Sequence, residues 1–523
     1  MNILLTAINA KYIHSNLAVY SLRACAGEYR DAVELAEYTI NNQKDYILEE
    51  LYKRKPDVLC FSCYIWNIDY VTDIAREYKK LCPSVPIWVG GPEVSYEVEA
   101  FLRENPYIDG VMIGEGEDTF RELCGYYAHK RKLSDIAGIA FRKNSTGNST
   151  SVNNIGGNKA GEIVFTSPRP IKNMSEIPFC YDTLDDFSNR IIYYESSRGC
   201  PFSCSYCLSS VDKTLRFRDT EIVKRELKFF IDQKVPQIKF VDRTFNCNHA
   251  HAMELWRFIK ANDNGVTNFH FEISADLLNQ EELELISDMR PGLIQLEIGV
   301  QSTNEVTIKE IHRTMKLERL KEVVKLIQSG NNIHEHLDLI AGLPYEDYDS
   351  FGRSFDEIYE LKPNQLQLGF LKVLKGSYMF EHAAEYGIVY HDKPPYEVMS
   401  TKWLSFDDVI KIKRVEDMLE VYYNSGQFEI TMKLMECIFD SAFEFFQELG
   451  DFYEANGYFG MSHSRIRRCE ILLEFLALYL HGCDNDAMTS VVLSENAGDR
   501  DNTDFDENAI DRDSTDFDEN EQI

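Results

Sequence analysis

Short apolar runs alternate with amphipathic stretches over the amino-terminal part of the chain. The strand-like runs are NILLTAI, VELAEYTI, DVLCFSCYI, VPIWVGG and DGVMIGEG. Strands that alternate with helices predict a parallel sheet with helices on both faces. Polar, Gly-bearing loops follow most of these strands, and open parallel sheets bind ligands at the carboxyl ends of their strands. We therefore expect a ligand site at that edge of the sheet.

A second alternating block begins with RIIYYESS at Arg190. Its later strand-like runs are PQIKFVDRTF, NFHFEISAD, LIQLEIGVQS, HEHLDLIAGLP and NQLQLGFLKVL, with helical patterns between them. Six such units predict an open (β/α)6 barrel, two units short of closure. From about Ser377 to His481 the strands stop, and long helical patterns such as SRIRRCEILLEFLALYLHG predict a third, helical domain.

The segment between the two blocks is rich in Asn, Ser and Gly, as in RKNSTGNSTSVNNIGGNKAG. The short runs GIAFRK and EIVFTS on either side predict a linker built around an exposed hairpin. The sequence thus predicts an α/β protein. Its parts are a Rossmann-like domain (1–127), a linker with a β-hairpin (128–185), a partial TIM barrel (186–376), an all-α domain (377–483) and a disordered acidic tail (484–523).

The formal net charge of −31 argues against a nonspecific nucleic-acid binder, which needs a basic surface. Part of this charge lies in the tail, where 14 acidic residues accompany two arginines. The tail contains the repeat DRDNTDFDEN and DRDSTDFDEN. Alternating Asp residues also occur in calcium-binding loops, but the central Gly and closing Glu of such a loop are absent, so a solvated, disordered tail is favoured.

The start of the sequence shows no basic leader, and no window approaches the roughly 18 apolar residues of a membrane span. The 13 cysteines are scattered, which fits reduced thiols better than a disulfide framework. We therefore expect a cytoplasmic protein that does not enter a membrane. Cys60 and Cys63 form a C-x-x-C pattern, but they lie on opposite faces of a predicted buried strand, which favours core cysteines over a redox or metal pair.

Three further cysteines, Cys200, Cys204 and Cys207, lie close together in ESSRGCPFSCSYCLSS, directly after the first barrel strand. Barrel active sites lie at the carboxyl ends of the strands. A structural zinc site needs a fourth ligand, and the next cysteine, Cys247, lies beyond another strand. An iron–sulfur cluster fits three cysteines better, because three thiolates leave one iron open for a substrate-like molecule.

The pattern CxxxCxxC, with Tyr206 before the last cysteine and at the head of a (β/α)6 block, resembles that of the radical S-adenosylmethionine (SAM) enzymes. The resemblance implies a [4Fe-4S] cluster on the three cysteines and SAM on its open iron. It further implies that one electron cleaves SAM to methionine and a 5′-deoxyadenosyl radical, which abstracts hydrogen from an unactivated C–H bond. The implied partner is a low-potential electron donor such as flavodoxin or ferredoxin.

The later strand ends resemble the motifs of this family in the same order. Asp242 and Arg243 in VDRTFN match the position that contacts the methionine amino group, although the usual Gly-Gly-Glu is absent. Arg313 fits a carboxylate partner, because guanidinium binds carboxylate through two hydrogen bonds. For Asp276 and Glu297 the alternative is a structural role, in which the carboxylate caps a helix or forms an ion pair. The residues that the resemblance assigns to SAM are Tyr206, Asp242, Arg243, Ser274, Asp276, Glu297, Gly299, Gln301, Arg313, Gly342 and Pro344.

A parallel-sheet domain ahead of such a barrel resembles the cobalamin-dependent branch of this superfamily. Three features resemble the loops of this branch: Ser62 in SCYIWN, the pair Gly90-Gly91 and the run GEGEDTF. Small residues at such turns allow the nucleotide tail of cobalamin to lie close to the backbone. A plain Rossmann-like domain is the alternative, but GxGxxG is missing after the first strand. The residues assigned to cobalamin are Asn9, Lys11, Tyr12, His14, Ser15, Asn16, Ser62, Tyr64, Trp66, Asn67, Gly90, Gly91, Pro92, Glu93, Gly114, Glu115 and Gly116.

The sequence leaves the lower axial ligand of cobalt open. The Asp-x-His-x-x-Gly motif of enzymes that ligate cobalt through histidine is absent. His14 lies in the corresponding loop, where a histidine ligates cobalt or forms a hydrogen bond with the corrin or a backbone carbonyl. Cobalamin with a weak or absent lower protein ligand is the favoured state.

The combined resemblance covers about residues 1–374, and the helical remainder resembles the C-terminal extension of one subfamily. It implies a methyltransferase that spends one SAM on the radical and one on the remethylation of cob(I)alamin. The alternatives are a cobalamin radical enzyme that rearranges, cyclises or oxidises its substrate, and a sensor without turnover. The substrate is not indicated. Residues Val373 to Gly376 and the helical domain are predicted to cover the mouth of the barrel. Candidate pocket aromatics are Tyr396, Trp403, Tyr422 and Tyr423, although an aromatic at helical spacing is more often a core residue.

Overall fold

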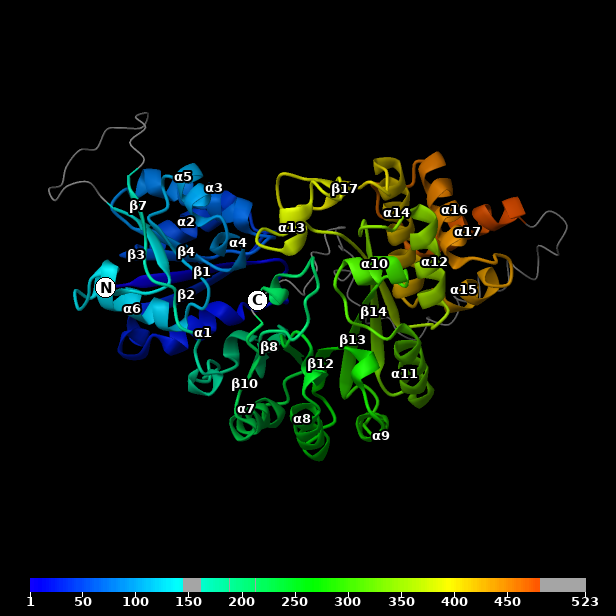
Figure 1. Cartoon of the computed structure of the whole chain (residues 1–523), viewed down its shortest axis with the longest axis horizontal. Helices are drawn as coiled ribbons and strands as arrows, with labels where there is room; N and C mark the ends of the chain where they lie inside the picture. Colours follow the sequence, from blue (N-terminus) through cyan, green and yellow to red (C-terminus); the bar gives the residue numbers. More distant parts are fainter. Residues whose placement is uncertain (144–160, 188, 212, 480–523) are drawn as a thin grey trace.

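The computed structural model describes residues 1–143, 161–187, 189–211 and 213–479. The predicted acidic tail with its repeats lies outside these residues, as does most of the Asn-rich segment of the predicted linker. Figure 1 shows the amino-terminal domain in blue, the barrel in green and the carboxy-terminal helices in orange, with a yellow segment around α13 between the two outer parts. Among the described residues, no helix is long and apolar enough to cross a membrane.

Seven strands form the first sheet, in the order β2-β1-β3-β4-β5-β6-β7. They are β1 (Ile3–Asn9), β2 (Val33–Thr39), β3 (Val58–Ser62), β4 (Ile87–Gly90), β5 (Gly110–Met112), β6 (Ile139–Arg142) and β7 (Ile163–Phe165). β1 to β5 are parallel, as the alternating pattern predicts, and β6 and β7 are antiparallel. The predicted hairpin is thus β6 and β7, and it extends the first sheet beyond β5 instead of standing apart as a linker. The other domain borders stay predictions.

Helices cover both faces of this sheet. They are α1 (Leu17–Cys25), α2 (Lys44–Arg54), α3 (Ile68–Leu81), α4 (Pro92–Ser95), α5 (Val98–Glu104) and α6 (Glu117–Tyr127). α1 and α6 pack on the face that contains Cys60, whereas α2, α3 and α5 pack on the face that contains Cys63. The two cysteines are buried in separate cores, which confirms the prediction that they are core cysteines on opposite faces of the sheet.

Six parallel strands form the second sheet, in the order β15-β14-β13-β12-β11-β8. They are β8 (Ile192–Tyr194), β11 (Gln237–Phe240), β12 (Asn268–Ile273), β13 (Ile294–Gln301), β14 (His334–Ala341) and β15 (Gln365–Phe370). The order leaves β8 and β15 as the two edges, so the structure confirms the predicted open (β/α)6 barrel.

Amphipathic helices cover the outside of the barrel. They are α7 (Thr220–Asp232), α8 (His249–Ala261), α9 (Gln280–Ser287), α10 (Glu305–Glu310), α11 (Leu317–Gly330) and α12 (Tyr348–Tyr359). α7 illustrates their origin: Asp219 caps its first turn, and Val223, Leu227 and Phe230, spaced by four and three residues, are buried.

The carboxy-terminal part is mainly helical, as predicted. It comprises α13 (Tyr378–His382), β16 (Val389–Tyr390), β17 (Val398–Ser400), α14 (Phe406–Leu419), a π-helical turn (Glu420–Asn424), α15 (Glu429–Met435), α16 (Ala442–Ala455) and α17 (Arg465–Tyr479). The short antiparallel pair β16 and β17 differs from the all-α prediction. Phe443 of α16 packs against Phe351 and Phe355 of α12, so the helical part shares a core with the barrel.

A buried carboxyl group lies at the amino end of β14. The side chain of Glu335 is fully buried, and neither of its carboxylate oxygens has a hydrogen-bond partner among the described residues. Burial raises the pKa of Glu335 from 4.5 to about 8, with a smaller opposing effect from the Gln328 amide. Glu335 therefore keeps its proton in the folded protein at neutral pH.

This carboxyl group makes the stability of the barrel pH-dependent. The unfolded chain releases the proton near pH 4.5 and the folded chain near pH 8, so stability falls as the pH rises between these values. Glu335→Gln is expected to raise stability at about pH 8, by on the order of 3 kcal/mol, and to have little effect at about pH 5. Thermal melts at both pH values test this, with the exposed Glu281→Gln as control. Equal destabilisation by Glu335→Gln at both pH values would contradict it.

Candidate active site

The three cysteines lie on a loop that follows β9 (Ser197–Arg198), at the carboxyl end of the first barrel strand. Gly199 begins the loop with a φ of 91°, and a Cβ atom there would lie 2.5 Å from the Thr214 carbonyl oxygen. Glycine alone fits this position without strain. Cys200 and Cys204 are buried and Cys207 is partly exposed. The loop thus brings three thiols to the mouth of the barrel.

Two backbone hydrogen bonds fix this loop between the second and third cysteines. Ser205 donates from its N–H to the Ile311 carbonyl at 2.9 Å, and the Ser205 carbonyl accepts from the Met379 N–H at 2.8 Å. Burial raises the pKa of the Cys200 thiol above its ordinary value.

The three cysteines supply thiol donors from a single loop. A four-iron cluster binds each thiolate at a different iron, so its ligands need not converge. Three thiols on one pinned loop therefore fit the cluster.

A polar cavity opens beside the cysteine loop at the mouth of the barrel. Six of the residues assigned to SAM line it: Arg243, Ser274, Glu297, Gly299, Gln301 and Arg313. Seven further residues complete the lining: Phe202, Cys204, Thr244, Glu272, Ile273, Thr314 and Asp338. We call this space the SAM cavity, and Cys204 joins it to the cysteine loop.

Arg313 is a partly buried cation in this cavity, and its Nε–H is an unused donor. Its Nη2–H donates to the Gly299 carbonyl, and its Nη1 lies 3.2 Å from the Tyr206 hydroxyl and 3.9 Å from the Cys204 Sγ. Its Nε–H has no hydrogen-bond partner among the described residues, and neither has the buried Oε1 of Gln301. Buried polar groups are normally paired, so these atoms fit a polar ligand such as SAM. Tyr206 supports Arg313 and does not line the cavity.

Asp242 does not reach the SAM cavity, contrary to the prediction. Its Oδ2 accepts from the Ser196 N–H at 2.9 Å, and its Oδ1 accepts from the Ser196 and Ser197 hydroxyls at 2.6 and 2.5 Å. Burial raises the pKa of Asp242 to about 7. Arg243 lines the cavity, but a guanidinium repels the methionine ammonium that this motif usually contacts. The motif therefore does not supply the predicted acceptor.

Carboxylates from other strands line the SAM cavity instead. Glu272 of β12 lies two residues before Ser274, so the alternation along the strand directs both toward the cavity. Asp276 lies outside it and accepts from the Ser274 hydroxyl at 2.8 Å and from the N–H of Lys316, the residue before α11, at 3.1 Å. Asp276 thus holds the start of α11 instead of lining the cavity. Glu272 and Asp338 were missed, although the same alternation contains the signal for Glu272.

Glu297 lines the SAM cavity, as the resemblance implies, and it also takes part in ion pairs, which was the alternative role. Its Oε2 lies 3.0 Å from the His270 Nε2 and 3.4 Å from the Lys239 Nζ, and all three side chains are buried. Burial alone would raise the pKa of Glu297, but Lys239 and His270 hold it well below its ordinary value. An ionised carboxylate is therefore fixed in the wall of the SAM cavity.

Gly342 and Pro344 lie outside the lining of the SAM cavity. A Cβ atom at Gly342 would lie 2.6 Å from the Val398 side chain, so this glycine allows β17 to approach. The Pro344 carbonyl accepts from the Thr307 hydroxyl at 3.0 Å. Both residues therefore shape the turn after β14 without touching the cavity.

A second, largely apolar cavity lies between the carboxyl ends of β3, β4 and β5 and those of β8 and β11. Eight of the residues assigned to cobalamin line it: Ser62, Tyr64, Gly90, Gly91, Pro92, Gly114, Glu115 and Gly116. The sequence missed the apolar part of the lining, including Leu17, Leu22, Phe61, Met112, Phe179 and Tyr181, because apolar residues in core positions carry no signal of a cavity. We call this space the interdomain cavity.

The residues of the interdomain cavity fit a large ligand with a polar tail. The buried Ser62 hydroxyl has no hydrogen-bond partner among the described residues. A Cβ atom at Gly114 would meet no atom within 4 Å, so the backbone there faces open space. Gly91 has a φ of 120°, and a Cβ atom there would lie 2.4 Å from the Cys63 carbonyl oxygen, so only glycine is accommodated. These features suit the nucleotide tail of cobalamin.

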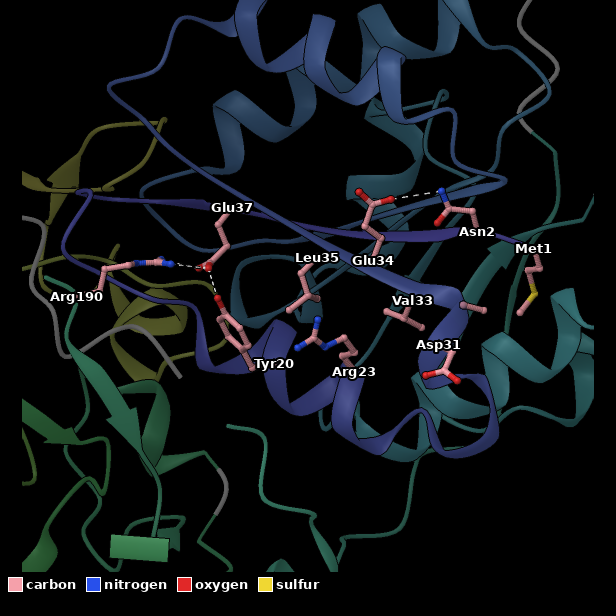
Figure 2. A pocket seen from close by; sticks show the side chains of 11 residues that line it. Met1, Asn2, Tyr20, Arg23, Asp31, Val33, Glu34, Leu35, Glu37 and Arg190 are labelled. Carbon is pink, nitrogen blue, oxygen red and sulfur yellow. Dashed lines mark hydrogen bonds and ion pairs between the residues drawn. The ribbon is translucent and has the colours of Figure 1, made fainter. Parts of the chain in front are cut away.

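The remaining residues assigned to cobalamin do not line the cavity: Asn9, Lys11, Tyr12, His14, Ser15, Asn16, Trp66, Asn67 and Glu93. Several of them build the scaffold beside it. Figure 2 shows Glu37 of β2 between Tyr20 and Arg190 in a polar cleft at the open edge of the first sheet. The Asn9 amide and the Asn16 N–H both donate to Glu37 at 3.0 Å. Asn9 and Asn16 thus hold the scaffold beside the cavity through the carboxylate of Glu37.

His14 is turned toward the barrel. Its Nδ1 lies 2.7 Å from the Tyr193 hydroxyl of β8, and its side chain is buried outside the cavity lining. This geometry does not support His14 as a cobalt ligand and favours the alternative, in which His14 forms a hydrogen bond. Its partner is the Tyr193 hydroxyl, and not the corrin or a backbone carbonyl as expected from the sequence. The interdomain cavity therefore suits cobalamin without a lower histidine ligand.

An arginine next to the cysteine loop joins the two domains. Arg198 contacts Glu195 at 2.7 Å, Glu117 at 2.8 Å and Glu115 at 3.3 Å. Burial alone would lower the pKa of Arg198, but Glu195 and Glu117 hold it well above its ordinary value. Glu115 also accepts from Arg216, so this residue both lines the cavity and anchors the barrel.

The segment between the barrel and the helical part contacts the amino-terminal domain. The Tyr396 hydroxyl donates to Glu93, and Lys375 lies 3.5 Å from the same carboxylate. Leu374 and Tyr396 pack with the stacked rings of Tyr64 and Trp66. The predicted covering role of this segment thus has support, and Tyr396 touches the loop beside the interdomain cavity.

The other candidate aromatics are core or support residues. Tyr422 is fully buried and its hydroxyl contacts that of Tyr453. Tyr423 donates to the Pro363 carbonyl, and Trp403 packs on Tyr345. None of the three lines either cavity.

Comparisons with protein families match three parts of the chain. The chain matches the B12 binding domain over residues 3–124 and the radical SAM superfamily over residues 194–358. Residues 384–506 match a family described as a protein of unknown function, DUF4080.

Individual relatives carry the same pair of domains. The chain is 28% identical over 361 residues to the cobalamin-dependent radical SAM methyltransferase TokK of Streptomyces tokunonensis, covering 64% of this chain and 49% of the relative. It thus spans about half the length of that relative. It is 22% identical over 355 residues to the anaerobic magnesium-protoporphyrin IX monomethyl ester cyclase of Rubrivivax gelatinosus, covering 65% of this chain and 60% of the relative.

A solved structure has the same fold. The radical SAM methyltransferase TsrM of Kitasatospora setae, determined with cobalamin and a [4Fe-4S] cluster bound, aligns with a TM-score of 0.59 and 16% identity. The alignment covers 76% of this chain and 82% of TsrM.

Proposed function

Because this chain belongs to the cobalamin-binding radical SAM enzymes, we propose that it is a methyltransferase that acts at an unactivated carbon of its substrate. The observation that carries the proposal is that the SAM cavity and the interdomain cavity meet at Arg243, which lines both. A substrate at this junction contacts both cofactors. The relative TokK, a methyltransferase of this class, supports the reaction type.

In this proposal the chain's own residues hold each cofactor. Cys200, Cys204 and Cys207 bind the [4Fe-4S] cluster. Arg313 donates its Nε–H to the SAM carboxylate, and Glu272 accepts from the SAM ammonium.

The interdomain cavity holds cobalamin in the same way. Ser62 donates to or accepts from the nucleotide tail, and Gly90 and Gly91 leave room for it. When bound, the cofactors supply a 5′-deoxyadenosyl radical for hydrogen abstraction and a methyl group for transfer. The partner that this chemistry requires is a low-potential one-electron donor of the flavodoxin or ferredoxin class.

A second candidate function keeps both cofactors without methyl transfer. The similarity to the cyclase of Rubrivivax gelatinosus favours cyclisation, rearrangement or oxidation as this second candidate.

Methyl-deuterated SAM distinguishes these functions. The reconstituted holoenzyme, a reductant and a small-molecule extract of the native host are expected to give a product with a deuterated methyl group. One 5′-deoxyadenosine and one S-adenosylhomocysteine are expected per labelled product. Turnover with 5′-deoxyadenosine but without labelled product supports the second candidate. Absence of 5′-deoxyadenosine above a Cys200→Ala control supports a sensor without turnover.

A further inference from the structure

A lysine, a histidine and a glutamate lie together inside the barrel, beside the SAM cavity. Lys239 of β11, His270 of β12 and Glu297 of β13 are all buried. The strand neighbours of Lys239, Ile238 and Phe240, belong to the core under the outer helices, so the alternation along β11 directs Lys239 into the barrel. Barrel interiors are mostly filled with branched apolar side chains, and a buried ammonium needs a partner to offset its loss of hydration.

Glu297 is the member of this group that reaches the SAM cavity. It belongs to the lining of the cavity, whereas Lys239 and His270 do not. The Oε2 of Glu297 lies 3.4 Å from the Lys239 Nζ and 3.0 Å from the His270 Nε2. Two partners from other strands restrict the rotation of the carboxylate, and the ammonium stabilises its negative charge at a buried position. Lys239 thus acts on the cavity through Glu297 without entering it.

The other groups around Glu297 do not replace the charge of Lys239. Burial raises the pKa of Glu297, and Lys239 is the largest of the opposing influences, followed by His270. The residues in register with Glu297 are Glu272 of β12, which is acidic, and His336 of β14. Burial lowers the pKa of His336 to about 4, so this imidazole is neutral at pH 7. The remaining charged residues of the cavity lining are Asp338, Arg243 and Arg313.

A fixed anion in this wall matters for SAM because of the charges that surround it. SAM carries a cationic sulfonium, and two guanidinium groups, those of Arg243 and Arg313, already line the cavity. A carboxylate held at one place offsets the repulsion between these cations, and its effect is larger in a partly buried site than in water. If Glu297 took up a proton, the wall would lose this negative charge.

We infer that Lys239 is a positioning residue for SAM binding, which holds Glu297 in place as an anion in the wall of the SAM cavity. The inference rests on SAM as a cofactor of the proposed function and adds a residue that does not itself line the SAM cavity. A purely structural role of Lys239 predicts a different result, because its loss would then weaken SAM binding equally at every pH and also in the absence of the Glu297 carboxylate.

Equilibrium binding of SAM tests the inference without turnover. The sample is the reconstituted holoenzyme with the oxidised [4Fe-4S] cluster, which lacks the electron needed to cleave SAM. Equilibrium dialysis with isotope-labelled SAM gives the Kd at about pH 6 and about pH 8.5, on either side of neutrality. The ratio of the Kd of a variant to that of the wild type at the same pH removes the titration of SAM itself.

Lys239→Met removes the ammonium and keeps an unbranched side chain. Burial then acts on Glu297 with less opposition, so the carboxyl group keeps its proton at about pH 6, and SAM is expected to bind at least about tenfold more weakly than to the wild type. At about pH 8.5 more of Glu297 is ionised, so the loss is expected to be at least about threefold smaller.

A second substitution shows whether the effect passes through Glu297. Glu297→Gln is expected to weaken SAM binding by a similar factor at both pH values, because the amide does not titrate. Adding Lys239→Met to Glu297→Gln is expected to cause no further loss. Lys228→Met removes a lysine from an exposed ion pair on α7 and is expected to match the wild type.

Three results would overturn the inference: wild-type affinity of Lys239→Met at both pH values, an equal loss at both, or a further loss on adding it to Glu297→Gln. Iron content and thermal stability are measured first, and Lys239→Gln replaces Lys239→Met if the latter does not retain the cluster. Absence of SAM binding to the wild type would overturn both the inference and the proposed function. Failure of methyl transfer alone appears separately, as a product without deuterated methyl.

Discussion

Replacing Cys200, Cys204 or Cys207 with alanine is expected to abolish the formation of 5′-deoxyadenosine from SAM. Each variant leaves a cluster with two protein ligands, which is not retained. The rate is expected to fall by roughly three orders of magnitude or more, which corresponds to about 4 kcal/mol in the activation barrier. Iron and sulfide content, together with 5′-deoxyadenosine released under dithionite, measure the effect.

A cysteine outside the loop provides the control. Cys437 is exposed and lies in the helical part of the chain, so Cys437→Ala is expected to retain both the cluster and the activity. If one of the three loop variants kept its iron and its rate, that cysteine would not be a ligand, and the assignment of the loop would be wrong.

Arg198→Gln is expected to be the most destabilising substitution at the domain interface. Removing the guanidinium leaves Glu117 and Glu195, whose side chains are 7% and 12% exposed, without their main cation. Breaking a buried charge network by removing one partner costs about 3–5 kcal/mol. Glu115 and Glu117 belong to the amino-terminal domain, so the interdomain cavity is expected to open and cobalamin affinity to fall at least about tenfold.

The matched control is an arginine in an exposed pair. Arg121 lies 3.0 Å from Glu28, and both side chains are about half exposed. Arg121→Gln is therefore expected to cost about 0.5 kcal/mol or less. Urea titrations and cobalamin titrations of both variants measure the difference. Similar curves for Arg198→Gln and Arg121→Gln would show that the network does not hold the domains together.

The barrel and its cysteine loop could be predicted from the sequence for a physical reason. A buried strand appears in the sequence as a short run of apolar residues. Each such run in the second block is a strand of the barrel, and the strands lie side by side in chain order. The three cysteines lie in a run of eight residues that follows the first strand, so their location follows from local spacing. Local patterns of this kind can be read without knowing which distant residues contact the segment.

Side-chain direction at strand ends could not be predicted in the same way. His14 and Asp242 both follow strands at the correct edge, but each turns to a partner in another element, Tyr193 or Ser196. A loop residue has several allowed directions, and the choice depends on hydrogen bonds to distant segments. Many of the candidate residues therefore line the two cavities at these strand ends, whereas others, such as His14 and Asp242, do not.

Long-range ion pairs were also beyond the sequence pattern. Arg198 is paired with Glu117, which lies 81 positions earlier in the chain and in another domain. Charged residues that are predicted to face water give no sign of such a partner. The same limit hid Asp338, whose place in the lining depends on how the strands meet around the SAM cavity.

Pulsed electron paramagnetic resonance tests most directly the central claim that the cluster loop and the cobalamin cavity face one shared space. The sample is the holoenzyme with cob(II)alamin and the reduced cluster, each of which carries an unpaired electron spin. The account predicts that the cob(II)alamin spin relaxes faster in the wild type than in Cys200→Ala, because the two spins are close. Equal relaxation rates in the two proteins, with both cofactors bound in the wild type, would contradict it.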